Sequence, residues 1–390
     1  MRLSIFINSV VEMPKKEDPN IGYGTQLMHA AQEGHTAEVK ELLAAGAKLD
    51  FVGKDGNTPL IAAAIAGHEA VLSLLLRGDP AVGINIANEL GCTALTNAAI
   101  HGHETIANLL LTKGADPDIK SVGKGHTALA YAAIAGNETI VDLLLVKGAK
   151  PNIVTHDGDT ALILASKGRQ DRVVSLLLAR GADPNITNNS GYTALSYAAM
   201  FGFETTVDLL LTGGGEHDIP TIDGDTPLIL ASRFRQVGVV AQLLARGADI
   251  DTTNMRGHTA LTCAAMSGHE KVVDLLLKKG ARHDIVTGDG DTPLIMAIKD
   301  GRDRVVPLLL AEGANLDTAN DIGHTALSYA AMLGNEAIVR LLLKNGAKRD
   351  IMTKSGDTVL TLARLARNGR ILRLLEEPMD KLVSKQSVRN

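Results

Sequence analysis

Apolar residues recur along the chain as two short stretches at helical spacing, separated by glycine. In the unit from 257 to 289, apolar residues follow Thr259 at intervals of three and four, and a second apolar face spans 272–277. Thr259 is a natural helix N-cap, and Gly268 and Gly280 are placed to end the two helices. An Asp-Gly turn then leads into the next unit. The pattern predicts a helix–loop–helix unit followed by a projecting finger.

This unit repeats along almost the whole chain. Its threonine occurs eleven times, and the spacing between successive copies is 33, then 35, then 34, and then 33 seven times. A fixed period in this range indicates stacked repeats, because no single unit can bury its own apolar face. The threonines are Thr25, Thr58, Thr93, Thr127, Thr160, Thr193, Thr226, Thr259, Thr292, Thr325 and Thr358. The sequence therefore predicts an all-α repeat solenoid.

From about residue 125 the repeats alternate between two types, which gives a second period two repeats long. One type reads Gly-Asp-Thr and begins at 158, 224, 290 and 356. The other reads Gly-His-Thr or Gly-Tyr-Thr and begins at 125, 191, 257 and 323. Duplication of a two-repeat unit accounts for the alternation. We expect the surface to repeat every second unit.

The unit resembles the ankyrin repeat, whose motif reads Thr-Pro-Leu-His-x-Ala. Threonine, leucine and alanine of this motif are present in all eleven copies, but the histidine is missing from each. Its place holds Met28, Ile61, Thr96, Ala130, Ile163, Ser196, Ile229, Thr262, Ile295, Ser328 and Thr361. In the family this histidine helps to tie neighbouring repeats together. The resemblance implies stacked helix-loop-helix repeats with β-hairpin-like fingers, in which apolar contacts or hydroxyl groups replace the histidine.

The repeats predict one elongated domain over residues 22–376. Residues 1–21 are expected to form an N-terminal cap or a disordered segment, and residues 377–390 a polar C-terminal tail. These flanks are too short to hold a catalytic domain. We therefore expect no enzymatic activity.

Composition excludes several classes of partner and compartment. The net charge of −5 and the pI of about 6.2 lack the basic footprint of a nucleic-acid-binding protein. No apolar run is long enough to span a membrane. Cys92 and Cys263 lie five repeats apart, too far for a disulfide, and free thiols fit a reducing compartment. The sequence predicts a cytoplasmic protein, and we expect a monomer.

No catalytic or metal-binding constellation emerges from the repeat. The His-Glu pairs belong to the loop between the two helices, and no second histidine follows at metalloprotease spacing. His126, His258 and His324 occupy one finger position, two or four repeats apart, so they cannot share a zinc ion. The Asp-Gly-Asp stretches are turns that precede a threonine cap. We expect no cofactor and no metal.

Ankyrin proteins generally bind partners with their finger tips and the exposed side of the first helix of each repeat. Positions four, seven and eight after the motif threonine share that side. Apolar and cationic residues alternate strictly at the seventh position from residue 134 to residue 332. The predicted partner-binding residues are Tyr131, Lys167, Tyr192, Tyr197, Met200, Phe201, Arg233, Phe234, Met266, Lys299, Tyr329 and Met332.

Two interpretations of this side remain open. Exposed methionine and tyrosine with arginine between them is the composition of an interface core. Alternatively, the tyrosines and methionines fill gaps between helices, while the cations pair with Asp159, Asp225 and Asp291 of their own fingers. Five of the ten phenylalanines and tyrosines lie within residues 192–234, which favours a binding hot spot there.

These observations predict a non-catalytic scaffold that binds a protein or peptide in a concave groove. Cations along the groove would steer an acidic partner, which is one option for the ligand. One alternative is an effector of an intracellular bacterium or parasite, which would act on host proteins in the host cytoplasm. A structural spacer without a preferred ligand is another.

Overall fold

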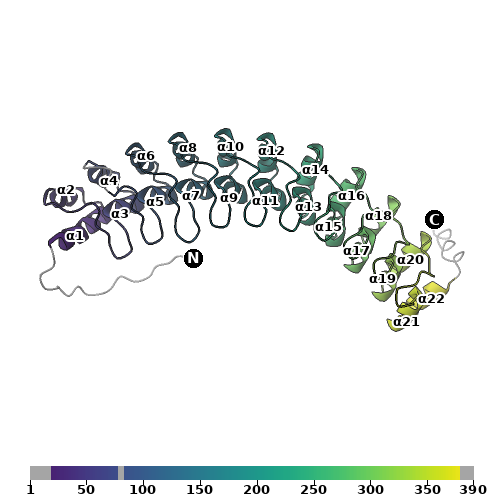
Figure 1. Ribbon diagram of the computed structural model, residues 1–390. Helices are drawn as coiled ribbons and strands as arrows, with labels where there is room; N and C mark the ends of the chain where they lie inside the picture. Colours follow the sequence, from purple (N-terminus) through teal and green to yellow (C-terminus); the bar gives the residue numbers. More distant parts are fainter. Residues whose placement is uncertain (1–18, 78–82, 378–390) are drawn as a thin grey trace, which may run out of the picture. The chain divides into compact units, whose positions relative to one another are not determined.

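The computed structural model describes residues 19–77 and 83–377, which contain 22 α-helices and no β-strand (Figure 1). They form two compact units, one ending at Asp157 and one beginning at Gly158. Most of the predicted N-terminal segment, residues 1–18, and nearly all of the predicted C-terminal tail, residues 378–390, lie outside the described residues. The repeats are numbered by their motif threonine, from repeat 1 at Thr25 to repeat 11 at Thr358.

The N-terminal unit is a stack of four helix pairs. First helices pack on first helices, α1 on α3, α3 on α5 and α5 on α7, and second helices pack on second helices in the same order. The helices are α1 (Pro19–Glu33), α2 (Thr36–Ala44), α3 (Pro59–Ala66), α4 (Glu69–Leu75), α5 (Ala94–His101), α6 (Glu104–Thr112), α7 (Ala128–Ala135) and α8 (Glu138–Val146).

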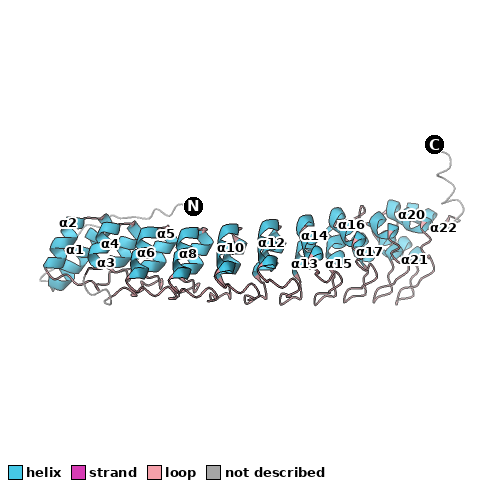
Figure 2. Cartoon of the chain, turned by 90° about the horizontal axis from the view of Figure 1, so that it is seen from above, coloured by secondary structure: helices cyan, strands magenta, loops and turns pink. Residues whose placement is uncertain are grey.

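The C-terminal unit has the same kind of arrangement in seven pairs, with its finger loops along one edge of the helices (Figure 2). Its first helices are α9 (Ala161–Lys167), α11 (Ala194–Phe201), α13 (Pro227–Arg233), α15 (Ala260–Ser267), α17 (Pro293–Lys299), α19 (Ala326–Met332) and α21 (Val359–Leu365). Its second helices are α10 (Asp171–Ala179), α12 (Glu204–Thr212), α14 (Val237–Ala245), α16 (Glu270–Lys278), α18 (Val306–Ala311), α20 (Glu336–Lys344) and α22 (Gly369–Glu376).

The motif threonine begins the first helix, as predicted, in ten of the eleven repeats. In repeat 8, Thr259 Oγ1 accepts a hydrogen bond of 3.1 Å from the backbone N–H of Thr262. The same cap recurs in the other repeats from Thr58 to Thr358. Thr25 is the exception, because α1 begins at Pro19 and contains it.

The ninth residue after the motif threonine has a left-handed backbone in every repeat and ends the first helix. Glycine serves there in eight repeats, for example Gly268 with φ of 76°. Arg169, Arg235 and Arg367 take the same conformation, with φ of 54°, 64° and 51°. A side chain in this region costs roughly 1–2 kcal/mol. These three repeats therefore carry local backbone strain.

Each finger is a tight turn joined to the next finger through its backbone. The Thr287 N–H donates to Asp291 O at 2.9 Å and closes the turn, with no strand ladder. The Gly288 N–H donates to Arg256 O of the preceding finger at 2.8 Å. A Cβ atom on Gly257 would lie 2.8 Å from Gly288 N, and its φ is +73°. The motif glycine is therefore needed for fingers to approach this closely.

The predicted replacement of the motif histidine by hydroxyl groups is wrong. The Thr262 hydroxyl bonds Thr259 within its own repeat, at 3.1 Å between oxygens, and so does not reach a neighbour. The loop between the two helices makes the tie instead. His269 Nε2 lies 2.9 Å from Arg233 O of the preceding repeat, and Arg302 Nε donates to Met266 O at 2.9 Å. In this chain the side chain that links neighbouring repeats therefore lies in the loop between the two helices, whereas the family motif has it on the first helix.

Candidate functional site

The first helices of the C-terminal unit lie side by side, and the fingers project next to them (Figure 1). We call this side the inner face: the residues four, seven and eight places after each motif threonine, with the adjoining fingers. Of the predicted residues, Phe201, Phe234 and Met332 are the most exposed, at 45%, 47% and 41%. The half-buried ones are Lys167, Tyr192, Tyr197, Met200, Arg233, Met266, Lys299 and Tyr329. Tyr131 is also half-buried and belongs to α7 of the N-terminal unit.

Four aromatic residues of repeat 6 form a continuous chain of ring contacts. Tyr192 stacks on Tyr197 with ring centroids 4.9 Å apart, and Tyr197 stacks on Phe201 at 6.3 Å. Phe203, the N-cap residue of α12, continues the chain at 5.6 Å from Phe201. Phe234 holds the position of Phe201 in the next repeat. The predicted aromatic cluster thus joins the finger of repeat 6 to the loop at the far end of α11.

The cations of the inner face pair with the aspartates of their own fingers. Lys167 Nζ lies 2.6 Å from Asp159 Oδ2, and Lys299 Nζ lies 2.6 Å from Asp291 Oδ2. Arg233 makes a two-pronged contact with Asp225, at 2.5 and 2.8 Å. The aspartate side chains are almost fully buried. This confirms the pairing that the second interpretation of the sequence predicts, and it balances the charges of the face.

An asparagine from the following repeat completes each pair. Asn254 Nδ2 donates to Asp225 Oδ1 at 2.7 Å, while its Oδ1 accepts from the N–H groups of Arg256 and His258 at 3.0 Å. One side chain therefore holds its own finger and also binds the repeat before it. The paired-repeat network is this arrangement in three copies, Asp159–Lys167–Asn188, Asp225–Arg233–Asn254 and Asp291–Lys299–Asn320.

The network also positions two of the predicted tyrosines. Asn188 Nδ2 donates to the Tyr197 hydroxyl at 3.1 Å, and Lys167 Nζ lies 4.2 Å from the centre of the Tyr197 ring. In the same way, Asn320 Nδ2 donates to the Tyr329 hydroxyl at 3.1 Å, and Lys299 Nζ lies 5.2 Å from the centre of the Tyr329 ring. The rings are therefore held in fixed orientations on the inner face.

In the middle copy of the network, a cysteine replaces the tyrosine. Cys263 is buried, and its Sγ lies 3.7 Å from Arg233 Nη2. Burial raises the pKa of the Cys263 thiol, although Arg233 opposes the shift. Burial also raises the pKa of Cys92, the free cysteine of the N-terminal unit. Both thiols are therefore poorly suited to act as nucleophiles.

The network keeps its cations charged. Burial alone would lower the pKa of Arg233, but the hydrogen bonds and charges of Asp225 and Cys263 together outweigh burial and raise the pKa. The same balance raises the pKa of Lys167, through Asp159 and Tyr197. A lysine with a raised pKa cannot serve as a general base near neutral pH. The paired cations of the inner face are therefore not suited to accept a proton near neutral pH.

The network's three asparagines are not among the residues predicted from the sequence. They lie on the fingers, outside the first helices, but they recur in every second repeat, in phase with the aspartates. That spacing was the signal that could have found them.

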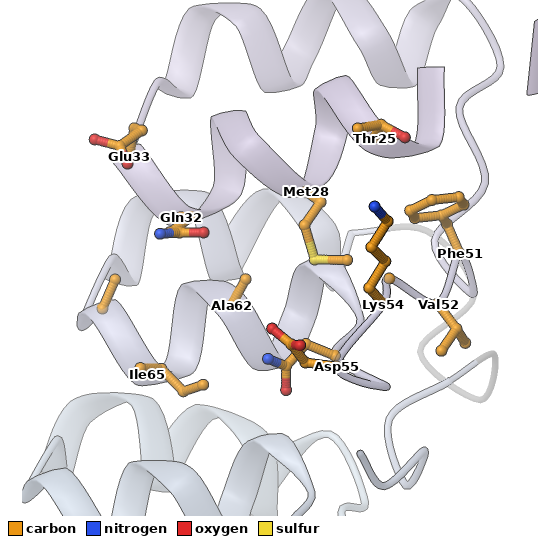
Figure 3. A pocket seen from close by; sticks show the side chains of 13 residues that line it. Thr25, Met28, Gln32, Glu33, Phe51, Val52, Lys54, Asp55, Ala62 and Ile65 are labelled. Atoms are coloured by element: carbon orange, nitrogen blue, oxygen red, sulfur yellow. The ribbon is translucent and has the colours of Figure 1, made fainter. Parts of the chain in front are cut away.

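The N-terminal unit contains a hollow of about 910 Å³ that the sequence analysis also missed (Figure 3). Its walls come from α1, α3 and the finger between α2 and α3. Met28, Phe51 and Ile65 supply apolar surface, and Lys54 and Asp55 contribute charged groups.

On the α3 wall of the hollow, repeat 2 has small residues where repeat 6 has aromatic ones. Ala62 and Ala66 lie four and eight places after their motif threonine. Tyr197 and Phe201 hold the same places in repeat 6. The opposite wall comes from α1, the helix that contains its motif threonine.

In residues 19–77 and 83–377, no three histidine, cysteine, aspartate or glutamate side chains are grouped so that they could hold a metal ion. No helix within these residues is both long and apolar enough to cross a membrane.

The model of the ankyrin-repeat family, described as ankyrin repeats in three copies, matches residues 27–121, 116–188, 172–254, 240–320 and 306–384. Together these segments cover most of the chain, and the chain belongs to the ankyrin-repeat family. A comparison with curated protein sequences gives no significant match. Ankyrin repeats are generally protein–protein interaction modules and are typically non-catalytic.

Proposed function

We propose that this chain is a non-catalytic scaffold that binds a protein or peptide on the inner face of its C-terminal unit. The observation that carries the proposal is the exposure of Phe201 and Phe234, at 45% and 47%, in equivalent places of adjacent repeats. Binding energy at interfaces concentrates in a few large side chains of this kind. The stacked rings of Tyr192 and Tyr197 support Phe201 from the finger side.

The ion pairs change the expected basis of recognition. Because Lys167, Arg233 and Lys299 are each matched by a buried aspartate, they add no net charge to the face. Their attraction for an acidic partner is correspondingly weak. Recognition would instead rest on apolar and aromatic contact, with Met200 and Met266 as adaptable surfaces between the rings.

Tyr131 is the counterpart of these residues in the N-terminal unit. Its hydroxyl donates to Ser121 Oγ at 3.3 Å, and its ring meets His126 edge-on at 4.9 Å. We propose that it offers the same kind of contact, anchored by neutral groups.

Replacing Phe201 and Phe234 together by alanine tests the proposal. We expect partner binding to weaken by roughly 2–4 kcal/mol, as for hot-spot side chains. The free energy of unfolding should change little, because both rings are already half exposed. Partners are captured from lysate with the wild type beside the variant and then titrated against each purified protein.

Lys278→Ala is the matched control. Lys278 is exposed at the end of α16 and pairs only with Asp274, at 2.8 Å. This variant should bind as the wild type does. If the double phenylalanine variant folds and also binds normally, the proposed face is wrong.

A further inference from the structure

At the seventh position of the inner face, the C-terminal unit has a methionine in every second repeat from repeat 6 to repeat 10, and we call each of these a methionine rung. Met200, Met266 and Met332 occupy the seventh position in repeats 6, 8 and 10. The intervening repeats 7 and 9 hold the neutralised pairs of Arg233 and Lys299 at that position. Consecutive first helices from α11 to α19 pack directly on one another. The methionine rungs are therefore two helix spacings apart.

Unpaired carboxylates lie between the methionine rungs, on the fingers. Asp223 and Asp289 take the same exposed place on the fingers of repeats 7 and 9. Across the described residues, neither side chain has an ion-pair partner. The finger between them, in repeat 8, has the exposed Arg256 at its tip. Repeats with a methionine at the seventh position thus alternate with repeats that have a neutralised cation there and an exposed carboxylate on the finger.

These spacings correspond to those of an extended peptide. Packed helices are about 8–10 Å apart, so two repeats span roughly 16–20 Å. An extended chain rises about 3.3 Å per residue and covers that distance in about five to six residues. Of these two spacings only six is even, and only side chains an even number of residues apart leave a strand on the same side.

We infer that the ligand is an extended peptide whose apolar side chains recur every six residues, with lysine or arginine midway between them. This rests on the proposed function and names its ligand. The apolar side chains would meet Met200, Met266 and Met332 on the helices. The basic ones, three residues further on, leave the strand on its opposite side and would meet Asp223 and Asp289 on the fingers. Arg256 fixes the alignment, because it repels a basic side chain placed beside Met266.

The first test is unbiased selection. Random peptides of about 16 residues, long enough to cross three methionine rungs at about 3.3 Å per residue, are displayed and selected on the full chain. The expected result is enrichment of apolar residues six apart with basic residues midway. The same selection on Met266→Asp should lose this pattern, because the central rung becomes charged.

The second test is a charge exchange. A synthetic peptide with leucine at six-residue spacing and lysine midway should bind at least about tenfold more tightly than peptides of equal composition at five- or seven-residue spacing, a difference of about 1.4 kcal/mol. Glutamate in place of lysine should abolish binding to the wild type. The double variant Asp223→Lys with Asp289→Lys should restore it. Circular dichroism verifies that the variants fold.

The outcomes separate this inference from the proposed function. Peptides selected with a helical period, or with none, would overturn the inference, as would a selection without binders or a charge exchange without rescue. If such peptides or captured proteins still require Phe201 and Phe234, the proposed function stands. If they do not, the proposed function fails as well.

Discussion

Repeats 2 and 6 share one scaffold and present opposite surfaces. Both begin with a threonine cap and end the first helix at a left-handed glycine, Gly67 and Gly202. Repeat 2 borders a hollow of about 910 Å³, whereas repeat 6 carries a chain of stacked rings. The two repeats differ at the fourth and eighth positions, where repeat 2 has alanines and repeat 6 has aromatic rings. In this protein the motif determines the stack, and a few positions outside it determine what each repeat can contact.

The hydrogen-bonded contacts between the fingers of neighbouring repeats, which we call seams, also differ between the two units. In the C-terminal unit a buried aspartate, a cation and an asparagine close alternate seams. In the N-terminal unit the groups are neutral: Asn88 Nδ2 donates to Asn57 Oδ1 at 2.9 Å, and Cys92 takes the aspartate position in the next repeat. Charged seams gain strong hydrogen bonds, but every member depends on the others.

The largest expected effect comes from breaking a charged seam. Asp225→Ala removes the partner of both Arg233 and Asn254 and should cost about 3–5 kcal/mol, the usual loss when one member of a buried ion pair is removed. Cys92→Ala, at the same position of a neutral seam, should cost about 1 kcal/mol. Urea unfolding measures both losses, and hydrogen exchange in α13 and α15 locates the first.

Asp223→Ala is the surface control for that experiment. This aspartate is two residues away on the same finger but exposed, so its loss should change stability by no more than about 0.5 kcal/mol. Equal losses for Asp225→Ala and Cys92→Ala would remove the distinction between charged and neutral seams.

Filling the hollow should make repeat 2 resemble repeat 6. Ala66→Phe places a ring where Phe201 stands in repeat 6 and should reduce the binding of an apolar fluorescent dye severalfold, because the dye loses its cavity. Ala135→Phe, at the same exposed position of α7, adds the same ring away from the hollow. Dye binding that falls equally in both variants would show that the hollow is not the site.

A smaller effect on stability is expected at the ninth residue after the motif threonine, which has the left-handed backbone. Arg235→Gly should stabilise the protein by about 1 kcal/mol, because glycine adopts this backbone without strain but loses more freedom on folding. Arg169→Gly should gain less, since the Arg169 guanidinium lies 5.6 Å from the centre of the Phe203 ring. Thermal unfolding compares the two. A larger gain at residue 169 would mean that the ring contact contributes nothing.

The smallest effect concerns pH. Burial and the nearby cations Arg233 and Arg256 lower the pKa of His258 below 6.5, whereas Asp225 and Asp289 oppose the shift. Burial also lowers the pKa of His324. The unfolded chain therefore takes up these protons first, so this contribution to stability is complete above pH 6.5 and is lost as the pH falls from 6.5 through the lower pKa of the folded state.

Unfolding measured above and below pH 6.5 tests this linkage. Stability should fall on acidification, and the fall should be smaller when His258 and His324 are both replaced by glutamine. An unaltered pH dependence in the double variant would contradict the prediction.

The scaffold could be predicted from sequence because its determinants are local and repeated. Thr259, Gly268 and Gly280 each act within a few residues, as a cap or a left-handed helix end, and the structure confirms all three roles. The ties between repeats could not be predicted in this way. His269 reaches Arg233 O across 36 positions, and only the packing of the helices shows that the two meet.

The candidate site was predictable only in part. The pairing of Arg233 with Asp225 could be stated as an alternative because the two lie eight residues apart in one repeat. The contact between Asn254 and Asp225 crosses a seam between repeats, and helix periodicity does not reveal it. The hollow at Ala62 and Ala66 was missed for another reason, because an absent side chain leaves no motif to find.

The paired-repeat network also sets the step in which this chain can change its length. If repeat 8 were lost, Asp225 would face Thr287 in place of Asn254, and the hydroxyl of Thr287 already accepts the N–H of Asp291. Loss or gain of two repeats leaves every aspartate with its asparagine. Within the C-terminal unit, the segment that can be duplicated or deleted without breaking these hydrogen bonds is therefore a pair of repeats, not a single repeat.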